Sequence, residues 1–170
     1  CDMVNHGSNG FKVLIAKCCS KEKFTESRLR SSENTSSGKG KTKVLIEKVN
    51  DAVKVAKGDI VYIDKSNKHM YELSNRIRFI VSPEYGITNT DMFLGFLAGI
   101  LSQNYDIETI YLESFLTIAN VDVSNDADVE ATVAKIQEIS EKYDVDFVIS
   151  ASRDKSDMPE SIQGLVTVSL

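Results

Sequence analysis

The feature that most constrains the fold is an alternation of short apolar runs and amphipathic segments that starts near Lys43. Runs rich in β-branched and aromatic residues are typical of parallel strands that are buried on both faces. Segments with apolar residues three and four positions apart are typical of helices that cover such a sheet. The alternation predicts an α/β fold, a three-layer sandwich around a mostly parallel sheet. The expected strands are 59–64, 77–81, 109–113, 146–151 and 165–170, and the expected helices are 44–57, 90–104 and 126–143.

Length and composition indicate a single globular domain. The chain has 170 residues, of which 42% are hydrophobic and 26% are charged, which is enough apolar material for a buried core. No apolar run approaches the roughly 20 residues that span a bilayer, so we expect no membrane partner. Cys1, Cys18 and Cys19 form neither a zinc-binding pattern nor an even set for disulfides. We therefore expect a cytoplasmic protein.

Charge divides the sequence at Lys43. The first 43 residues hold nine Lys or Arg and four Asp or Glu, a net charge of +5. The remaining residues hold 11 Lys or Arg and 21 Asp or Glu, a net charge of -10. A basic tail is compatible with nucleic-acid binding, but an acidic body argues against a broad phosphate-binding face. We expect no strong interaction with nucleic acid.

A glycine- and lysine-rich stretch runs directly into the first expected helix and predicts a phosphate-binding loop. Glycines allow backbone N–H groups to surround phosphate oxygens, a lysine reaches the outer phosphates, and a hydroxyl group holds Mg²⁺. The N-terminal end of the helix adds positive potential for an anion. Lys41 is the expected catalytic lysine, and Thr42 is an expected ligand of Mg²⁺. The expected nucleotide-binding residues are Ser37, Gly38, Lys39, Gly40, Lys41, Thr42 and Lys43.

One position departs from the loop pattern. The full pattern Gly-x-x-x-x-Gly-Lys-[Ser/Thr] requires a glycine at position 35, where this chain has Thr35. A solvated basic turn is therefore the alternative. We favour the loop because a helix follows it at once within an α/β alternation.

Two expected strands end in an acid that is a candidate for the metal end of the same site. Phosphate-loop proteins place an acid at the tip of a hydrophobic strand, where it holds the Mg²⁺ shell directly or through water. We favour Glu113 as the catalytic and metal-binding acid, and the alternatives are Asp64 and a strand-end acid that only begins a loop. The residue after Glu113 is Ser114 rather than a second acid, so we expect hydrolysis to be slow.

From about Ser36 onward the chain resembles a family of small bacterial phosphate-loop proteins described as AAA-like or twitching-motility ATPase-like. The resemblance covers about three quarters of the chain and implies ATP binding in a single small domain. The order of elements is also similar to the thymidine kinase core, although the paired zinc cysteines and the lasso-like substrate segment of those kinases are missing. The matching stretches are 38–43, 58–64, 85–87, 95–100 and 146–150.

The start of the chain departs from that family. A phosphate loop joins a central strand to a helix within a few residues, yet the one candidate strand, 11–16, lies 18 residues before Thr35. Either 17–34 is an insertion or the first 34 residues are foreign to the fold. We favour the second hypothesis, in which 1–34 is a basic segment that is disordered or arises from a shifted reading frame or misplaced gene start. The phosphate-loop domain is then 35–170.

Three further positions carry weaker expectations. Arg153 follows an expected strand and is either a sensor of the γ-phosphate or, as we favour, a salt-bridged surface residue. His69 has no neighbouring ligand or nucleophile in the sequence and is expected at the surface. Gly95 and Gly99 are expected to allow close packing of their helix against the sheet.

The leading function is that of an ATP-binding protein with slow Mg²⁺-dependent hydrolysis and an unidentified protein partner. The alternative from another class is a non-catalytic adaptor or regulatory domain with a degenerate loop. A second alternative is a nucleoside kinase-like phosphotransferase. Calorimetry with ATP separates the first two, and a screen of nucleosides tests the third.

Overall fold

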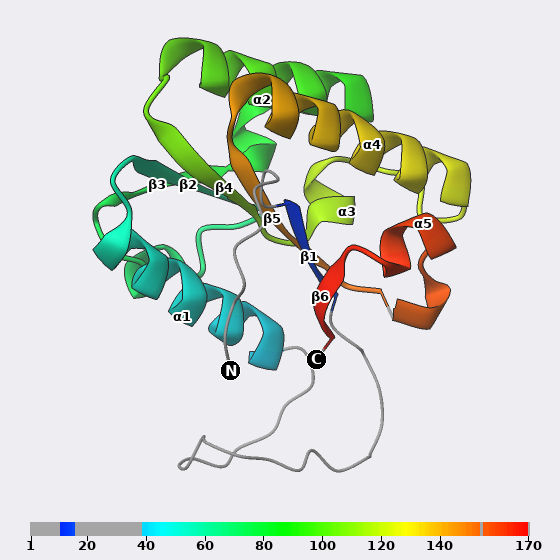
Figure 1. Cartoon of the computed structure of the whole chain (residues 1–170), viewed down its shortest axis with the longest axis horizontal. Coiled ribbons are helices and arrows are strands. Elements are labelled where there is room, and N and C mark those ends of the chain that lie inside the picture. The colour runs from blue at the N-terminus through cyan, green and yellow to red at the C-terminus, as the bar shows by residue number, and fades with distance from the viewer. Residues whose placement is uncertain (1–10, 16–38, 154, 170) are drawn as a thin grey trace.

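The computed structural model describes residues 11–15, 39–153 and 155–169. These residues form a six-stranded sheet in which all neighbouring strands are parallel, in the order β3-β2-β4-β5-β1-β6 (Figure 1). The strands are β1 (Phe11–Ile15), β2 (Asp59–Asp64), β3 (Ile77–Val81), β4 (Ile107–Leu112), β5 (Asp146–Ala151) and β6 (Val166–Ser169).

Helices cover both faces of this sheet, which confirms the expected α/β fold. In Figure 1, α1 lies on one face, and α2 and α4 lie together on the other. The longer helices are α1 (Lys39–Val55), α2 (Thr90–Gln103) and α4 (Asp126–Tyr143). The short helices are α3 (Phe115–Ile118) and α5 (Glu160–Gln163), and the 3₁₀ turns are η1 (Met70–Glu72), η2 (Ser82–Tyr85) and η3 (Lys155–Asp157).

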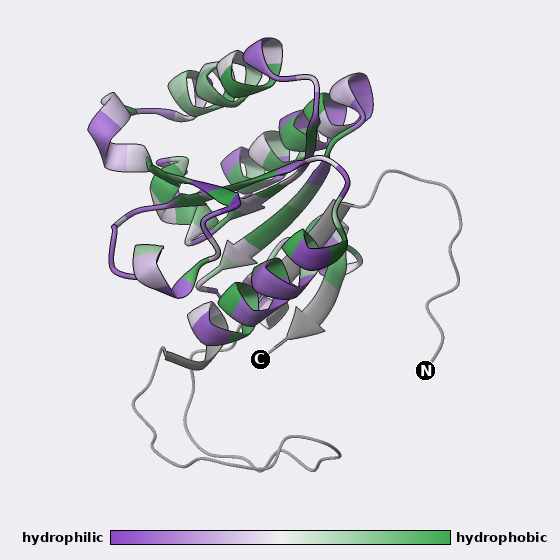
Figure 2. Cartoon of the chain, turned by 90° about the vertical axis from the view of Figure 1, so that its left-hand side faces the viewer, coloured by the Kyte–Doolittle hydropathy of each residue, from purple (hydrophilic) through white to green (hydrophobic). Residues whose placement is uncertain are grey.

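The strands are hydrophobic on both faces because each face meets a helical layer. Successive side chains of a strand point to opposite sides. Val61 and Ile63 of β2 therefore join the core under α2 and α4, whereas Ile60 and Tyr62 join the core under α1. The strands that carry hydropathy colours in Figure 2 are predominantly hydrophobic, and the helices carry both hydrophobic and hydrophilic residues.

A row of aromatic side chains crosses the sheet beneath α1. Tyr62 stacks on Phe79 of β3 with ring centroids 5.8 Å apart, and on Tyr111 of β4 with centroids 6.3 Å apart. These residues are direct partners in the strand register, which continues to Val148 of β5. The row therefore shows how β3, β2, β4 and β5 are aligned on this face.

Helix α1 begins five residues earlier than the apolar pattern predicts, at Lys39 rather than Val44. Its first turn is built from loop residues that lack apolar side chains, so the periodicity of the sequence does not reveal it. The bounds of α2 and α4 lie close to their expected positions. Asn89 caps α2, because its side chain accepts a hydrogen bond of 2.9 Å from the backbone N–H of Met92.

Strand β1 differs from the hypothesis that the first 34 residues are foreign to the fold. Phe11–Ile15 lies between β5 and β6 and pairs in parallel with both. The other residues of 1–34 lie outside the described residues. The hypothesis required a strand within a few residues of the helix, whereas the sheet includes a strand that lies much further away along the chain.

The expectation for Gly95 and Gly99 is wrong. Both glycines are exposed, and a Cβ added at either would meet no atom within 4 Å. Helix α2 instead packs on the sheet through larger side chains, including Phe93 and Leu97. No helix in the described parts of the chain is long and apolar enough to cross a membrane.

Candidate functional site

Three polar side chains continue the aromatic row at the carboxyl edge of the sheet. Ile63 pairs with Leu112, and Leu112 pairs with Ile149. The next residues along these strands are Asp64, Glu113 and Ser150, and all three are buried. They lie two positions beyond Tyr62, Tyr111 and Val148, whose side chains pack under α1, so they point toward the same face. The register therefore brings two carboxyl groups and a hydroxyl group into one line.

The backbone of β4 holds Glu113 in place. Its N–H donates a hydrogen bond of 2.9 Å to the carbonyl oxygen of Ile63, so the pairing with β2 extends one residue past the end of β4. Ser114 then adopts a left-handed conformation with φ of 54° and turns the chain into α3. The carboxyl group of Glu113 consequently stays at the end of the strand instead of following the chain away from the sheet.

The first turns of α1 approach this line of polar groups. The Thr42 hydroxyl donates a hydrogen bond of 3.3 Å to Oε1 of Glu113, across 71 positions of sequence. Lys39, Gly40 and Lys41 form the first turn of the same helix. The first N–H groups of a helix have no partner within it, and they lend its N-terminus positive potential. The positive end of this helix therefore lies next to Glu113.

The two carboxyl groups are deeply buried and incompletely paired. Asp64 is 2% exposed and Glu113 is 6% exposed. Oδ1 of Asp64 accepts hydrogen bonds from the backbone N–H groups of Lys65, at 2.6 Å, and Ser66, at 3.4 Å. Oδ2 of Asp64 and Oε2 of Glu113 are buried and have no hydrogen-bond partner among the described residues. Such atoms are rare in folded proteins and call for an explanation.

Electrostatics disfavours the charged form of both acids. Burial raises the pKa of Asp64, and the hydrogen bonds from Lys65 and Ser66 counteract this only in part. Burial also raises the pKa of Glu113, and the nearby charge of Asp64 raises it further. The hydroxyl groups of Ser150 and Thr42 act in the opposite direction. None of the salt bridges among the described residues involves either acid. The pair is therefore suited to a cation.

Tyr62 adds a third buried polar group to this region. Its hydroxyl oxygen is buried and has no hydrogen-bond partner in the described part of the chain. Burial, together with the charges of Glu113 and Asp64, holds its pKa far above the ordinary value. Tyr62 is therefore a neutral hydrogen-bond donor beneath the two acids.

The chain that leaves β2 brings positive charge to the same place. His69 is half-buried, and its Nδ1 lies 2.7 Å from Oε1 of Glu72. When protonated, His69 lowers the pKa of both Asp64 and Glu113, and Lys65 lowers that of Asp64. The sequence placed His69 at the surface without a role. Its position near both acids depends on the path of the loop between β2 and β3, which no sequence pattern predicted.

The structure thus unites several residues that the sequence had proposed separately. Thr42 and Glu113 are hydrogen-bonded, and Asp64, the alternative acid, lies next to Glu113 rather than in a different place. Lys43 is exposed on α1. The remaining loop residues are only partly covered: Ser37 and Gly38 lie outside the described residues, as do the side chains of Lys39 and Lys41.

Arg153 lies on the other side of the sheet edge. Its Nη2 is 3.0 Å from Oδ1 of Asp126, the first residue of α4. This ion pair agrees with the favoured interpretation of a salt-bridged arginine. It also directs the guanidinium group toward the α2 and α4 layer, away from Thr42.

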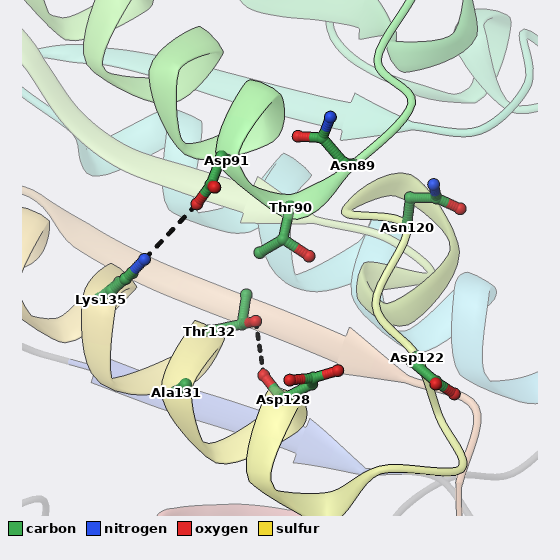
Figure 3. A pocket seen from close by; sticks show the side chains of 9 residues that line it. All are labelled: Asn89, Thr90, Asp91, Asn120, Asp122, Asp128, Ala131, Thr132 and Lys135. Carbon is green, nitrogen blue, oxygen red and sulfur yellow. Dashed lines mark hydrogen bonds and ion pairs between the residues drawn. The ribbon is translucent and has the colours of Figure 1, made fainter.

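A separate pocket of about 340 Å³ lies in that opposite layer (Figure 3). Lys135 and Asp91 form an ion pair of 3.5 Å across it. The remaining polar residues come from the start of α2, the segment after α3 and the first turns of α4. The pocket residues are Asn89, Thr90, Asp91, Asn120, Asp122, Asp128, Ala131, Thr132 and Lys135.

The polar groups near α1 are oxygen donors, the type of ligand that Mg²⁺ favours. Mg²⁺ favours oxygen ligands and is usually bound by one or two carboxylates together with water and substrate phosphates. Glu113 and Thr42 offer such oxygens, and Asp64 lies beside Glu113 at the end of the neighbouring strand. No group of three or more His, Cys, Asp or Glu that could hold a metal ion occurs within the described ranges.

Comparison of the chain with protein-family models and with curated proteins found no match.

Proposed function

We propose that this protein binds ATP together with Mg²⁺ at the N-terminal end of α1, in the manner of a phosphate-loop protein. The observation that carries the proposal is the contact between Thr42 and Glu113, a hydroxyl group and a buried acid brought to 3.3 Å by the fold. A phosphate loop needs this pairing of a helix-borne hydroxyl with an acid at a strand end. The sequence Gly40-Lys41-Thr42 supplies the loop end of the same site.

The N-terminal end of α1 binds the phosphates. The backbone N–H groups of the first turn, Lys39 to Thr42, have the positive potential that phosphate oxygens require. Lys41 supplies the charge for the outer phosphates. The rest of the loop, from Ser37, completes the phosphate contacts.

The acids supply the metal end of the site. Thr42 and Glu113 hold Mg²⁺, and the orphaned Oε2 of Glu113 gains a ligand or a coordinated water. When bound, the ion neutralises charge on the phosphates. The ion would also remove the cost of two buried carboxylates side by side, because a positive charge favours their ionised forms.

The experiment is isothermal titration calorimetry with ATP, in the presence and absence of Mg²⁺. We expect the wild-type protein to bind ATP more tightly with Mg²⁺ than without it. The Lys41→Ala variant should bind ATP at least tenfold more weakly, which corresponds to a loss of about 1.4 kcal/mol in binding free energy. Lys48→Ala is the matched control, because Lys48 is an exposed lysine on the same helix. Undetectable binding at millimolar ATP, or equal binding by Lys41→Ala, would reject the proposal in favour of a non-catalytic domain.

A further inference from the structure

We propose that Asp64 is the second acid of this site and orients the water that attacks the γ-phosphate, so that the protein hydrolyses ATP. The inference rests on the proposed binding of ATP and Mg²⁺. It reverses the expectation drawn from Ser114, which assumed that a second acid must directly follow the first in the sequence.

The structure supplies the second acid from the neighbouring strand. Asp64 ends β2, and the register of β2 and β4 sets it beside Glu113 on the α1 face. The hydrogen bond from Glu113 N–H to Ile63 carbonyl oxygen keeps the two strand ends together. Ser114 cannot take this place, because it follows Glu113 with a left-handed backbone and begins α3 on the opposite face. Asp64, at the end of the neighbouring strand, is therefore a second acid beside Glu113.

The carboxyl group of Asp64 is fixed in one orientation. Its Oδ1 is held by two backbone N–H groups, those of Lys65 and Ser66, so rotation of the group would break both hydrogen bonds. Its Oδ2 is then left buried, without a partner among the described residues. An acid with a purely structural role would have both oxygens satisfied. A fixed acceptor with a free oxygen is what a bound water requires, since preorganised groups align a reaction without reorganising during it.

The two acids have different tasks in this arrangement. Glu113 accepts a hydrogen bond from Thr42 and belongs to the metal end of the site. Asp64 ends β2, which lies one strand further from β5 than β4 does, and its Oδ2 is available to the water. The water oxygen forms a bond to the γ-phosphorus, and the bond from that phosphorus to the bridging oxygen breaks. ADP leaves with the electron pair of that bond, and the water proton ends on the released inorganic phosphate.

The test compares Asp64→Asn with Asp59→Asn. Asp59 stands at the amino end of the same strand, is exposed, and accepts a hydrogen bond of 2.7 Å from the Asn104 side chain. Asn keeps the shape of Asp but is a poorer acceptor for the water. We expect Asp64→Asn to bind ATP and Mg²⁺ by calorimetry as the wild type does, with turnover lowered by about 100-fold. Asp59→Asn should turn over ATP at the wild-type rate.

A second readout separates catalysis from structure. After incubation with ATP and Mg²⁺ and removal of free nucleotide, the Asp64→Asn protein should carry ATP, whereas the wild type should carry ADP. Asp64→Glu keeps the charge but moves the carboxyl group by one methylene, so it should also hydrolyse slowly while binding normally. Circular dichroism shows whether each variant is folded.

The possible failures are distinguishable. Wild-type binding of ATP with no turnover, or turnover by Asp64→Asn at the wild-type rate, overturns the role of Asp64 and leaves ATP binding standing. Absence of ATP binding by the wild type removes both proposals.

Discussion

At the scale of single residues, the most unusual feature is the pair of buried acids. A buried carboxylate without a compensating partner is costly, because water no longer solvates its charge. Asp64 and Glu113 lie at the ends of adjacent strands, and each retains one oxygen without a partner among the described residues. The proposed site for Mg²⁺ and ATP would account for such a pair in the core.

This pair predicts how stability depends on pH. Burial raises the folded-state pKa of Asp64 and Glu113 above the unfolded value of about 4. The two groups therefore favour folding most below that value, and this contribution is lost as the pH rises through their raised folded-state pKa. In the absence of nucleotide, the free energy of unfolding of Asp64→Asn relative to that of the wild type should increase by about 1 kcal/mol as the pH rises from 5 to 8.

Urea unfolding of the wild type and of Asp64→Asn at pH 5 and at pH 8 measures this change in relative stability. Asp59→Asn is the control, since Asp59 is exposed. If the stability difference between the wild type and Asp64→Asn is the same at pH 5 and pH 8, burial does not raise the pKa of Asp64 in the folded protein.

At the scale of elements, α2 shows how misleading a short motif can be. The Gly-x-x-x-Gly pattern suggests close packing, but Gly95 and Gly99 face outward. The glycine with a real steric role is Gly58, just before β2, where an added Cβ would lie 2.3 Å from the backbone oxygen of Asp106. Its N–H also donates a hydrogen bond of 2.9 Å to Glu108.

Substitution of these glycines by alanine should have opposite effects. Gly95→Ala should stabilise the protein by up to about 1 kcal/mol, because alanine favours a helix and meets no neighbour at this position. Gly58→Ala should destabilise it by about 1–3 kcal/mol, because the backbone of Asp106 must move. Thermal unfolding of the two variants checks both directions, and destabilisation by Gly95→Ala would mean that this face of α2 is covered in solution.

At the scale of the whole molecule, β1 occupies an interior position of the sheet. β6 pairs only with β1 among the described strands, and β1 joins it to β5. A chain without β1 would leave β5 with an open edge and β6 with no strand partner. Unpaired edges of this kind promote aggregation.

Truncation distinguishes this arrangement from the hypothesis of a foreign N-terminal segment. The fragment 35–170 should fail to unfold cooperatively and should aggregate, because β5 and β6 lose the strand between them. The fragment 11–170, which keeps β1, is the matched control and should unfold with one cooperative transition. A stable, monomeric 35–170 fragment would restore the earlier hypothesis.

Much of the fold was predictable because its signals are local. The strands at 59–64, 77–81 and 146–151 and the helix at 126–143 have the bounds that their apolar patterns predicted. The start of α1 was not, since its first turn has no apolar residues. The order of the strands was also beyond a local pattern, because it depends on how the crossovers pack.

By itself, the sequence determined the alternation of strands and helices, and with it the type of residue found at each strand end and at the start of α1. Periodicity and motif spacing are properties of residues close together in the chain, so they can be recognised from the sequence alone. Only the tertiary structure decided that Asp64, Glu113 and Thr42 meet. Their proximity depends on the register of β2 against β4 and on the face that α1 covers, which are relations between residues up to 71 positions apart.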